Sequence, residues 1–328
     1  MVVDEPGRAS LQHLSAMNSA RRGRFRFGVN TWAARTSREW IDKARRIEAL
    51  GYSTLCMPDH VADTLSPFSA LAVAAQAAPT LRVGPFVLNN DLRHPVVVAR
   101  EVATLDLLTD GRVELGLGAG YADAEYLQAG LRFDRGRVRV ARLGEAVSII
   151  KGLLAGENVS FTGEHYTITE HQIHPLPVQR SRPPILIGGN GRDLLTLAAK
   201  EADIVSFTGA TFPPGGRPVQ LSGFAADDFA QRIAWVRSAA AGRSPELNVL
   251  VQEVMVAESP RKAAEELASR FRVTSDVVLD SPFLLAGPTG HLIETLQARR
   301  ERWGISYIVV FERSIEDFAP VVARLAGT

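Results

Sequence analysis

The pattern that decides the fold lies in residues 81–120, which read LRVGPFVLNNDLRHPVVVAREVATLDLLTDGRVELGLGAG. The apolar run Leu81–Leu88 predicts a buried strand. Val96–Leu108 predicts a helix that begins just after Pro95, because proline favours the first helical position. Arg112–Leu117 predicts the next strand. Strand, helix and strand in this order form a parallel pair with a right-handed crossover, so the stretch predicts an α/β protein built on a parallel sheet.

The same alternation continues in both directions along the chain. Eight short apolar segments predict strands: Phe25–Asn30, Ser53–Met57, Leu81–Leu88, Arg112–Leu117, Pro184–Gly188, Asp203–Phe207, Leu247–Ala257 and Ile305–Phe311. Further segments predict helices: Trp40–Leu50, Ser69–Ala78, Val96–Leu108, Gly136–Leu154, Arg192–Ala199, Asp228–Ala241, Pro260–Arg270, Thr289–Arg302 and Ile315–Leu325. Eight βα units favour a closed (β/α)8 TIM barrel over an open doubly wound sheet, since no Gly-x-Gly-x-x-Gly follows the first strand.

We expect one barrel domain over residues 25–328, with insertions at the C-terminal ends of the strands. The segment 121–134 predicts a lid with a short helix, 159–168 a small hairpin, and the Gly- and Pro-rich stretch 209–225 a further insertion. Residues 1–24 contain arginines but no apolar core region, so they are not a secretory signal. We interpret them as a disordered leader or a remnant of cloning.

Composition narrows the classes of function. The chain has 328 residues, a formal net charge of +1 and one cysteine. The balanced charge gives no global attraction to nucleic acid or to an anionic membrane, and no apolar run reaches the ~20 residues that span a bilayer. A single cysteine excludes an internal disulfide framework, and Cys56 lies in an apolar stretch typical of a buried, inert thiol. We therefore predict a cytoplasmic protein with a small-molecule substrate, without nucleic-acid or membrane partners.

A glycine-rich segment ends the fifth predicted strand, at Gly188, Gly189, Asn190, Gly191 and Arg192. In a barrel the active site forms at the C-terminal strand ends. Glycines allow a ligand to approach the backbone closely, and the N-terminus of the following helix favours an anion. The segment thus predicts a phosphate site, to which Arg192 adds a bidentate donor; the alternative is a tight turn with a solvated arginine.

Other strand ends contain candidates for the chemistry. The stretch 116–120 includes Gly118 and Gly120, which indicate either room for a flat ring system or close strand packing. Asp59 and His60 follow the second strand and are the best acid/base candidates, against the alternative of a structural histidine. His94 precedes Pro95 and is expected to be structural.

The sequence also contains residues of two further site types. His165, His171 and His174 lie close together in sequence but lack a helical His-Glu-x-x-His pattern, so we expect no metal site. A pair of facing carboxylates would indicate a glycosidase, and Glu253 with Glu312 is the one plausible pair, ranked low. Aromatic side chains at strand ends are either walls of an apolar substrate pocket or ordinary rim packing; we expect a pocket wall from Trp32, Tyr121 and Phe207.

These motifs together resemble the luciferase-like monooxygenase superfamily. The resemblance rests on 81–88 with Arg93-His-Pro95, on Ala103-Thr-Leu-Asp106, on 110–120, on Ile187–Arg192 with Ala202-Asp203, and on Gly287-Pro-Thr-Gly290. It covers roughly residues 25–326, and within the superfamily the sequence is most similar to the branch that uses the deazaflavin F420 in place of FMN.

The resemblance implies a TIM-barrel oxidoreductase, usually dimeric, with a cofactor phosphate at 188–192 and a cis peptide at Phe86-Val87. We expect cofactor contacts from a set at the strand ends: His60, Phe86, Val87, Asn89, Gly118, Gly120, Gly188, Gly189, Asn190, Gly191, Arg192 and Thr208. The Asp59-His60 pair matches glucose-6-phosphate dehydrogenases of this branch. Tyr121 stands where they have a glutamate, and the stretch Thr208-Gly-Ala-Thr lacks the basic residue that they use for the substrate phosphate, which argues against a sugar phosphate.

The expected function is F420-dependent hydride transfer between the deazaflavin C5 and a small organic substrate. Reduction of an activated C=C or C=N bond is the first choice, with Tyr121 or His60 as proton donor and Asp59 beside them. The alternatives are an FMN-dependent monooxygenase that uses O₂, and a degenerate barrel without catalysis. A homodimer is expected from the resemblance alone.

Overall fold

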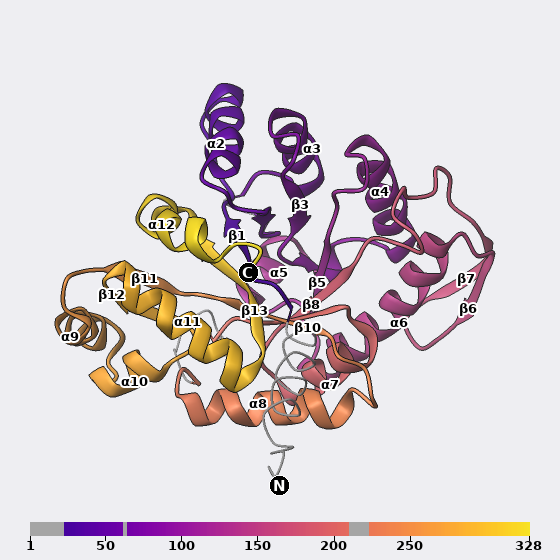
Figure 1. The fold of residues 1–328 in the computed structure, drawn as a ribbon. Coiled ribbons are helices and arrows are strands. Elements are labelled where there is room, and N and C mark those ends of the chain that lie inside the picture. Colours follow the sequence, from indigo (N-terminus) through magenta and orange to yellow (C-terminus); the bar gives the residue numbers. More distant parts are fainter. Residues whose placement is uncertain (1–22, 62–63, 210–222) are drawn as a thin grey trace, which may run out of the picture.

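Eight parallel strands form a closed barrel in the computed structural model, which describes residues 23–61, 64–209 and 223–328 (Figure 1). The barrel strands are β1 (Arg26–Asn30), β2 (Thr54–Met57), β3 (Arg82–Pro85) continued by β4 (Leu88–Asn89), β5 (Leu115–Gly118), β8 (Ile185–Gly188), β9 (Ile204–Phe207), β10 (Glu246–Leu250) and β13 (Ile305–Phe311). Each pairs in parallel with its neighbours in chain order. β13 returns to pair with β1, and Val83 bridges to Val113, which confirms the predicted (β/α)8 barrel.

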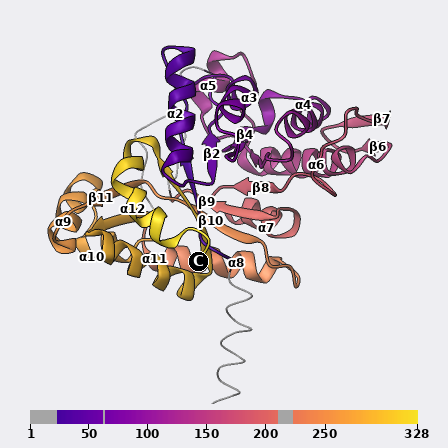
Figure 2. The ribbon, with the colours of Figure 1, turned by 45° about the horizontal axis from the view of Figure 1, so that its top comes forward.

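Helices surround the strands on the outside (Figures 1 and 2). They are α2 (Ser37–Ala49), α3 (Pro67–Ala77), α4 (Pro95–Leu108), α6 (Gly136–Ala155), α7 (Arg192–Glu201), α8 (Ala226–Ala239), α11 (Thr289–Trp303) and α12 (Ile315–Leu325). In α2, Trp40, Ala44 and Ile47 are buried on one face, and the Thr36 hydroxyl accepts a hydrogen bond from the backbone N–H of Glu39. The apolar stripe and the cap explain why this segment is helical.

Smaller elements extend the barrel. They are η1 (Asn90–Leu92), α5 (Asp123–Gln128), the antiparallel hairpin β6 (Val159–Thr162) with β7 (Thr167–His171), β11 (Glu253–Val256), α9 (Pro260–Phe271), α10 (Ser275–Asp280), β12 (Leu284–Gly287) and η2 (Glu312–Ser314). The short helix predicted within 121–134 and the hairpin are confirmed. Residues 1–22 of the predicted leader (1–24) and residues 210–222 of the predicted insertion lie outside the described residues.

One predicted strand was wrong in extent. The apolar run Leu247–Ala257 is two strands, because β10 ends at Leu250 and β11 leaves the barrel to pair with β12. β12 and α10 were not predicted at all. They cover α9 and form a separate small core with it around Leu267.

Partly buried charges connect four strands at the N-terminal end of the barrel. Arg26 on β1 binds Glu114, just before β5, at 2.5 Å and Glu246 on β10 at 2.7 Å. Arg82 on β3 binds the same Glu114 oxygen at 2.7 Å. The Arg26 guanidinium also lies 3.6 Å from the centre of the Tyr307 ring. Although burial opposes the charged form, Glu114 and Glu246 raise the pKa of Arg26, so it stays charged in the folded protein.

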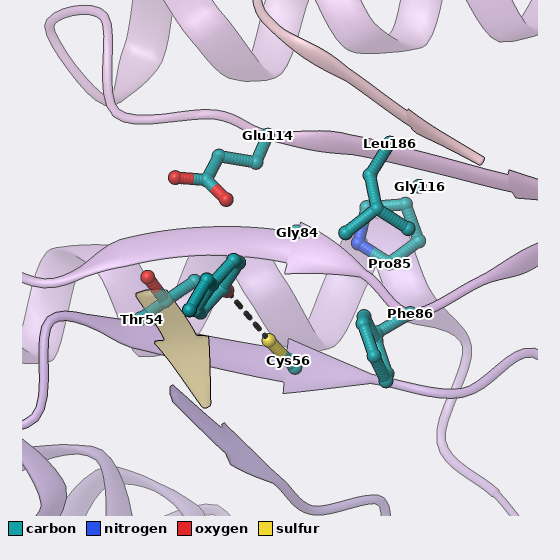
Figure 3. Close-up of a pocket in the computed structure, with 9 residues that line it drawn as sticks. Thr54, Cys56, Gly84, Pro85, Phe86, Glu114, Gly116 and Leu186 are labelled. Carbon is teal, nitrogen blue, oxygen red and sulfur yellow. Dashed lines mark hydrogen bonds between the residues drawn. The ribbon is translucent and has the colours of Figure 1, made fainter. Parts of the chain in front are cut away.

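A small cavity of about 10 Å³ lies above this ion-pair layer, inside the barrel (Figure 3). Its walls include Thr54, Cys56, Phe86, Glu114 and Tyr307. The volume is enough for about one water molecule, so the lower barrel is a packed core and not a channel. Burial raises the pKa of the Cys56 thiol to about 12, in keeping with the inert role expected from the sequence. Within the described residues, no helix is both long and apolar enough to cross a membrane.

We predict that Arg26→Met destabilises the fold, because Glu114 and Glu246 lose a buried partner. The expected loss in the free energy of unfolding is about 2–4 kcal/mol, measured by urea denaturation. Arg46→Met is the control, since Arg46 and its partner Glu316 are both more than half exposed, and it should cost less than about 1 kcal/mol. Equal losses in the two variants would contradict a structural role for the buried layer.

Candidate cofactor and substrate site

The strand ends meet at the C-terminal mouth of the barrel, where the Phe86-Val87 peptide is cis, as the resemblance implied. Val87 packs into space that glycines leave on neighbouring strands. A Cβ on Gly118 would lie 2.6 Å from Val87 Cγ2, and one on Gly188 would lie 3.3 Å from Val87 Cγ1. For Gly118 the structure therefore supports close packing, the second of the two interpretations offered above.

Gly120 serves the packing of the lid. Its φ is +73°, and a Cβ there would lie 2.1 Å from the Tyr126 hydroxyl and 2.6 Å from Asn89 Oδ1. Tyr126 OH lies 2.9 Å from both Asn89 Oδ1 and Asp91 Oδ2, and these two acceptors share its one proton. Asn89 Oδ1 also accepts from the Asp91 N–H. The predicted cofactor residue Asn89 thus holds the lid against η1 through its side chain.

His60 lies between two side chains of the lid. Its Nδ1 is 2.6 Å from Glu125 Oε1, and its Nε2 is 3.2 Å from the Tyr121 hydroxyl. The His60 and Tyr121 rings meet edge to face. The His60 side chain is 28% exposed and Glu125 19%, so ligands can reach the imidazole while the carboxylate is largely covered. The structure brings the two predicted proton donors together, and it adds Glu125, which was not among the residues expected from the sequence.

Tyr121 is held in its neutral form. Burial, reinforced by the nearby Glu125 charge, raises the pKa of Tyr121 to about 12. A phenol with this pKa is protonated at neutral pH and can donate a hydrogen bond or a proton.

Asp59 has a supporting position instead of a reacting one. Its carboxylate accepts two hydrogen bonds from Arg93, at 2.5 and 3.0 Å, and one from the Asn89 N–H at 3.1 Å. Asp59 itself is 6% exposed. All these bonds fix the turn after β2, so Asp59 orients the chain that presents His60.

The glycine-rich turn after β8 leaves an open helix terminus. α7 begins at Arg192 with Gly191 as its N-cap, and no side chain caps its first N–H groups. A Cβ on Gly191 would meet nothing within 4 Å. Arg192 is exposed, and it has no hydrogen bond or ion pair with the described residues. Free N–H groups beside an unpaired guanidinium suit a phosphate.

The rest of this turn is fixed by polar bonds between strand ends. Asn190 Nδ2 donates to Thr208 Oγ1 at 2.9 Å, and the Gly189 N–H donates to the Ser206 carbonyl at 3.0 Å. Gln252 Nε2 donates to the Thr208 carbonyl. Asn190 and Thr208 are therefore hydrogen-bonded to each other, a contact that the sequence did not predict.

Asn30 was missed by the sequence analysis. It ends β1, is 4% exposed, and its Oδ1 has no partner among the described residues. Gly28, two residues earlier, faces the barrel interior toward Cys56 and Tyr307, and alternation places Asn30 on the same side. A buried oxygen without a donor costs about 1–3 kcal/mol, so Asn30 fits a ligand N–H or O–H at the mouth. Its place at a strand end was the available signal.

The predicted aromatic walls divide into two groups. Trp32 meets Phe311 edge to face at 6.1 Å, and both follow or end strands at the mouth. Phe207 does not line the mouth. It is fully buried against Phe229 of α8, with ring centres 5.0 Å apart, because Ile204 and Ser206 are the β9 residues that face inward.

Other sequence candidates have structural partners. His94 caps α4 by accepting from the Val96 N–H. The described residues contain no group of three or more potential metal ligands. Glu312 binds Lys43 at 2.8 Å and Glu253 binds Arg270 at 3.1 Å, so the glycosidase pair is tied up in separate ion pairs.

The residues of the mouth fit a phosphate-bearing, ring-shaped cofactor. The open α7 terminus with Arg192 suits the phosphate, and the unpartnered Asn30 oxygen suits a ring or substrate donor. A closed parallel barrel with such a mouth defines the class as a TIM-barrel cofactor enzyme.

The family assignment is consistent with this class. Residues 17–304 match the family model described as luciferase-like monooxygenase, and the chain belongs to this family. A relative from Amycolatopsis mediterranei, named F420-dependent glucose-6-phosphate dehydrogenase, is 31% identical over 174 residues, which cover 51% of this chain and 52% of the relative. The aligned region thus spans about half of that dehydrogenase.

Solved structures share the fold. The F420-dependent tetrahydromethanopterin reductase from Methanopyrus kandleri has a TM-score of 0.74 at 18% identity, over 93% of this chain and 99% of that one. The oxygenating constituent of 3,6-diketocamphane monooxygenase from Pseudomonas putida, in complex with FMN, has a TM-score of 0.67 at 16% identity, over 92% and 96%. At these identities the likeness concerns the fold alone.

We predict that the tyrosines of the folded protein titrate at higher pH than free tyrosine. Burial raises the pKa of all five above 10, Tyr121 to about 12. The folded state therefore binds phenolic protons more tightly than the unfolded state. This stabilisation is complete below pH ~10 and is lost as the pH rises toward 12. Ultraviolet titration of tyrosinate should show little change up to pH ~10. A Tyr121→Phe variant that lost absorbance near pH 10 would contradict the raised pKa.

Proposed function

We propose that the protein is an F420-dependent oxidoreductase that moves a hydride between the deazaflavin C5 and a small organic substrate. The observation that carries this proposal is the contact of His60 with Tyr121 at the mouth, together with an open helix terminus at α7, which follows the strand next to β5. The curated relatives with 31–35% identity that are named as F420-dependent dehydrogenases support the choice of cofactor.

The chain's own residues would bind the cofactor in two parts. The turn Gly188–Arg192 with Thr208 would hold the phosphate, and Phe86 and Val87 would lie beneath the ring, with Val87 supported by its packing at Gly118. Asn30 would accept a hydrogen bond from the ring or the substrate. The cofactor would supply or accept the hydride, which no protein side chain can do.

The mouth favours reduction of an activated C=C or C=N bond. Such a substrate needs one proton in addition to the hydride, and Tyr121 with His60 can deliver it. The described residues after β9, Thr208 and Gly209, include no base that would hold a sugar phosphate. Asp59 takes no proton in this scheme, since Arg93 engages its carboxylate.

An FMN-dependent monooxygenase is the second candidate, because the same fold binds FMN in the Pseudomonas putida enzyme. It would need reduced flavin and O₂. A degenerate barrel without catalysis is the third. The close His60, Tyr121 and Glu125 contacts argue against it, since they give the fold no evident packing advantage at a half-exposed mouth.

We also propose a cytoplasmic homodimer. The single cysteine is buried and free, in keeping with a reducing compartment. The neighbouring helices α3 and α4 expose apolar side chains that a second copy would cover: Val73, Val97, Leu107 and Leu108. The molecular mass in solution tests this assembly.

We predict that the cofactor-free protein binds oxidised F420 more tightly than FMN, as followed by fluorescence titration. Arg192→Ala should weaken F420 binding by about 10- to 100-fold, because a charged hydrogen bond contributes roughly 1.5–3 kcal/mol. Arg38→Ala is the control, since Arg38 is 92% exposed on α2. Preference for FMN would favour the monooxygenase, and failure to bind either would favour the non-catalytic barrel.

We predict turnover of enones or imines with reduced F420, detected as the return of oxidised cofactor absorbance without O₂. His60→Ala should lower kcat by about 100-fold or more, the usual contribution of a general acid. The fold should stay intact, as checked by circular dichroism. Full activity in His60→Ala would remove this residue from the mechanism.

A further inference from the structure

We infer that Glu125 is a positioning residue that holds His60 as its Nδ1–H tautomer and so aligns a proton relay from His60 to Tyr121. The catalytic use of the relay rests on the proposed function, whereas the tautomer does not.

The geometry fixes the hydrogen on one ring nitrogen. Glu125 Oε1 lies 2.6 Å from His60 Nδ1. An ionised carboxylate can only accept, so a neutral imidazole must place its single N–H on Nδ1. His60 Nε2 is then an acceptor, and it faces the Tyr121 hydroxyl at 3.2 Å. The second nitrogen of a histidine commonly sets the role of the first in this way.

Glu125 is itself held in place. Its Oε2 accepts from the Val61 N–H at 3.4 Å, and the neighbouring Tyr126 anchors α5 through Asn89 and Asp91. The carboxylate is therefore fixed from both the turn after β2 and the lid. A side chain that only covered the mouth would not need its carboxylate to be oriented toward His60 Nδ1.

The relay balances for one reduction. The Tyr121 O–H bond breaks and its proton goes to the substrate atom that does not receive the hydride. Protonated His60 gives its Nε2 proton to the phenolate oxygen as it forms. His60 is left neutral with Nδ1–H donated to Glu125, and water restores its proton afterwards. Oxidation follows the reverse path. Because burial raises the pKa of Tyr121 to about 12, the phenol benefits from this second donor.

The direct test is the tautomer of His60 in cofactor-free protein. With ¹⁵N-labelled histidine at a pH where imidazole is neutral, long-range ¹H–¹⁵N spectra distinguish the two tautomers. His60→Gln identifies the His60 signals among the seven histidines. We expect Nδ1–H in the wild type, Nδ1–H retained in Glu125→Gln, whose amide oxygen still accepts, and a shift toward Nε2–H in Glu125→Ala. An Nε2–H signal in the wild type, or no change in Glu125→Ala, would overturn the inference.

Kinetics supply the second readout. Glu125→Ala should lower kcat about tenfold or more with F420 affinity changed less than about threefold, and Glu125→Gln should recover part of the loss. Combined with Tyr121→Phe, the losses should be less than additive, because both act on one relay. Glu265→Ala is the matched control, an exposed glutamate on α9.

The outcomes separate the two proposals. If wild type binds no F420 but shows the Nδ1–H tautomer that Glu125→Ala removes, the proposed function fails and the positioning role stands. If wild type turns over substrate but neither the His60 tautomer nor kcat changes in Glu125→Ala, the relay fails and the proposed function stands. Should Glu125→Ala not fold, the wild-type tautomer and the Glu125→Gln kinetics still decide.

Discussion

Arg26 lies at the bottom of the barrel between Glu114 and Glu246, and the shape of the mouth depends on this buried ion pair. The three residues are far apart in sequence and belong to the first, fourth and seventh strand positions. Arg26 therefore links the three strands through ion pairs, and its loss would leave the buried Glu114 with Arg82 as its remaining partner. Closing the barrel at the bottom gathers the opposite strand ends into one ring. His60 and Tyr121 thereby come within 3.2 Å although 61 residues separate them.

The two halves of the mouth differ in which atoms form the surface. Around β2, β3 and β5, side chains form the surface, and charged bonds such as Asp59 with Arg93 hold them. Around β8 and β9, the surface is mostly backbone and small residues, with Asn190 and Thr208 joining the turns. The half around β2, β3 and β5 can transfer protons, whereas the half around β8 and β9 can bind an anion. A hydride-transfer site needs both functions side by side, because a bound cofactor must be held while a proton moves at the substrate.

The sequence predicted the barrel because each strand and helix has a local pattern of its own. It could not predict that β10 ends at Leu250, since the apolar run continues and only pairing with β12 separates the two strands. Phe207 was misplaced because strand alternation alone does not say which set of residues faces inward. For Gly118 the sequence allowed either room for a ring or close strand packing. The contact with Val87, which the sequence does not show, favours close packing. Glu125 was missed because no local rule brings a lid carboxylate to a histidine 65 residues away.

Tyr121 and Glu125 reach the two nitrogens of His60 from one short stretch of chain. They are four residues apart, so the segment that begins at the end of β5 and enters α5 bonds the imidazole on both sides. The packing of Gly120 against Tyr126 and Asn89 sets the direction in which this segment leaves the strand. Any displacement of α5 therefore changes both bonds to His60 at once. The hydrogen bonds of the imidazole thus depend on the position of α5, and a larger residue at Gly120 would disturb both without touching His60.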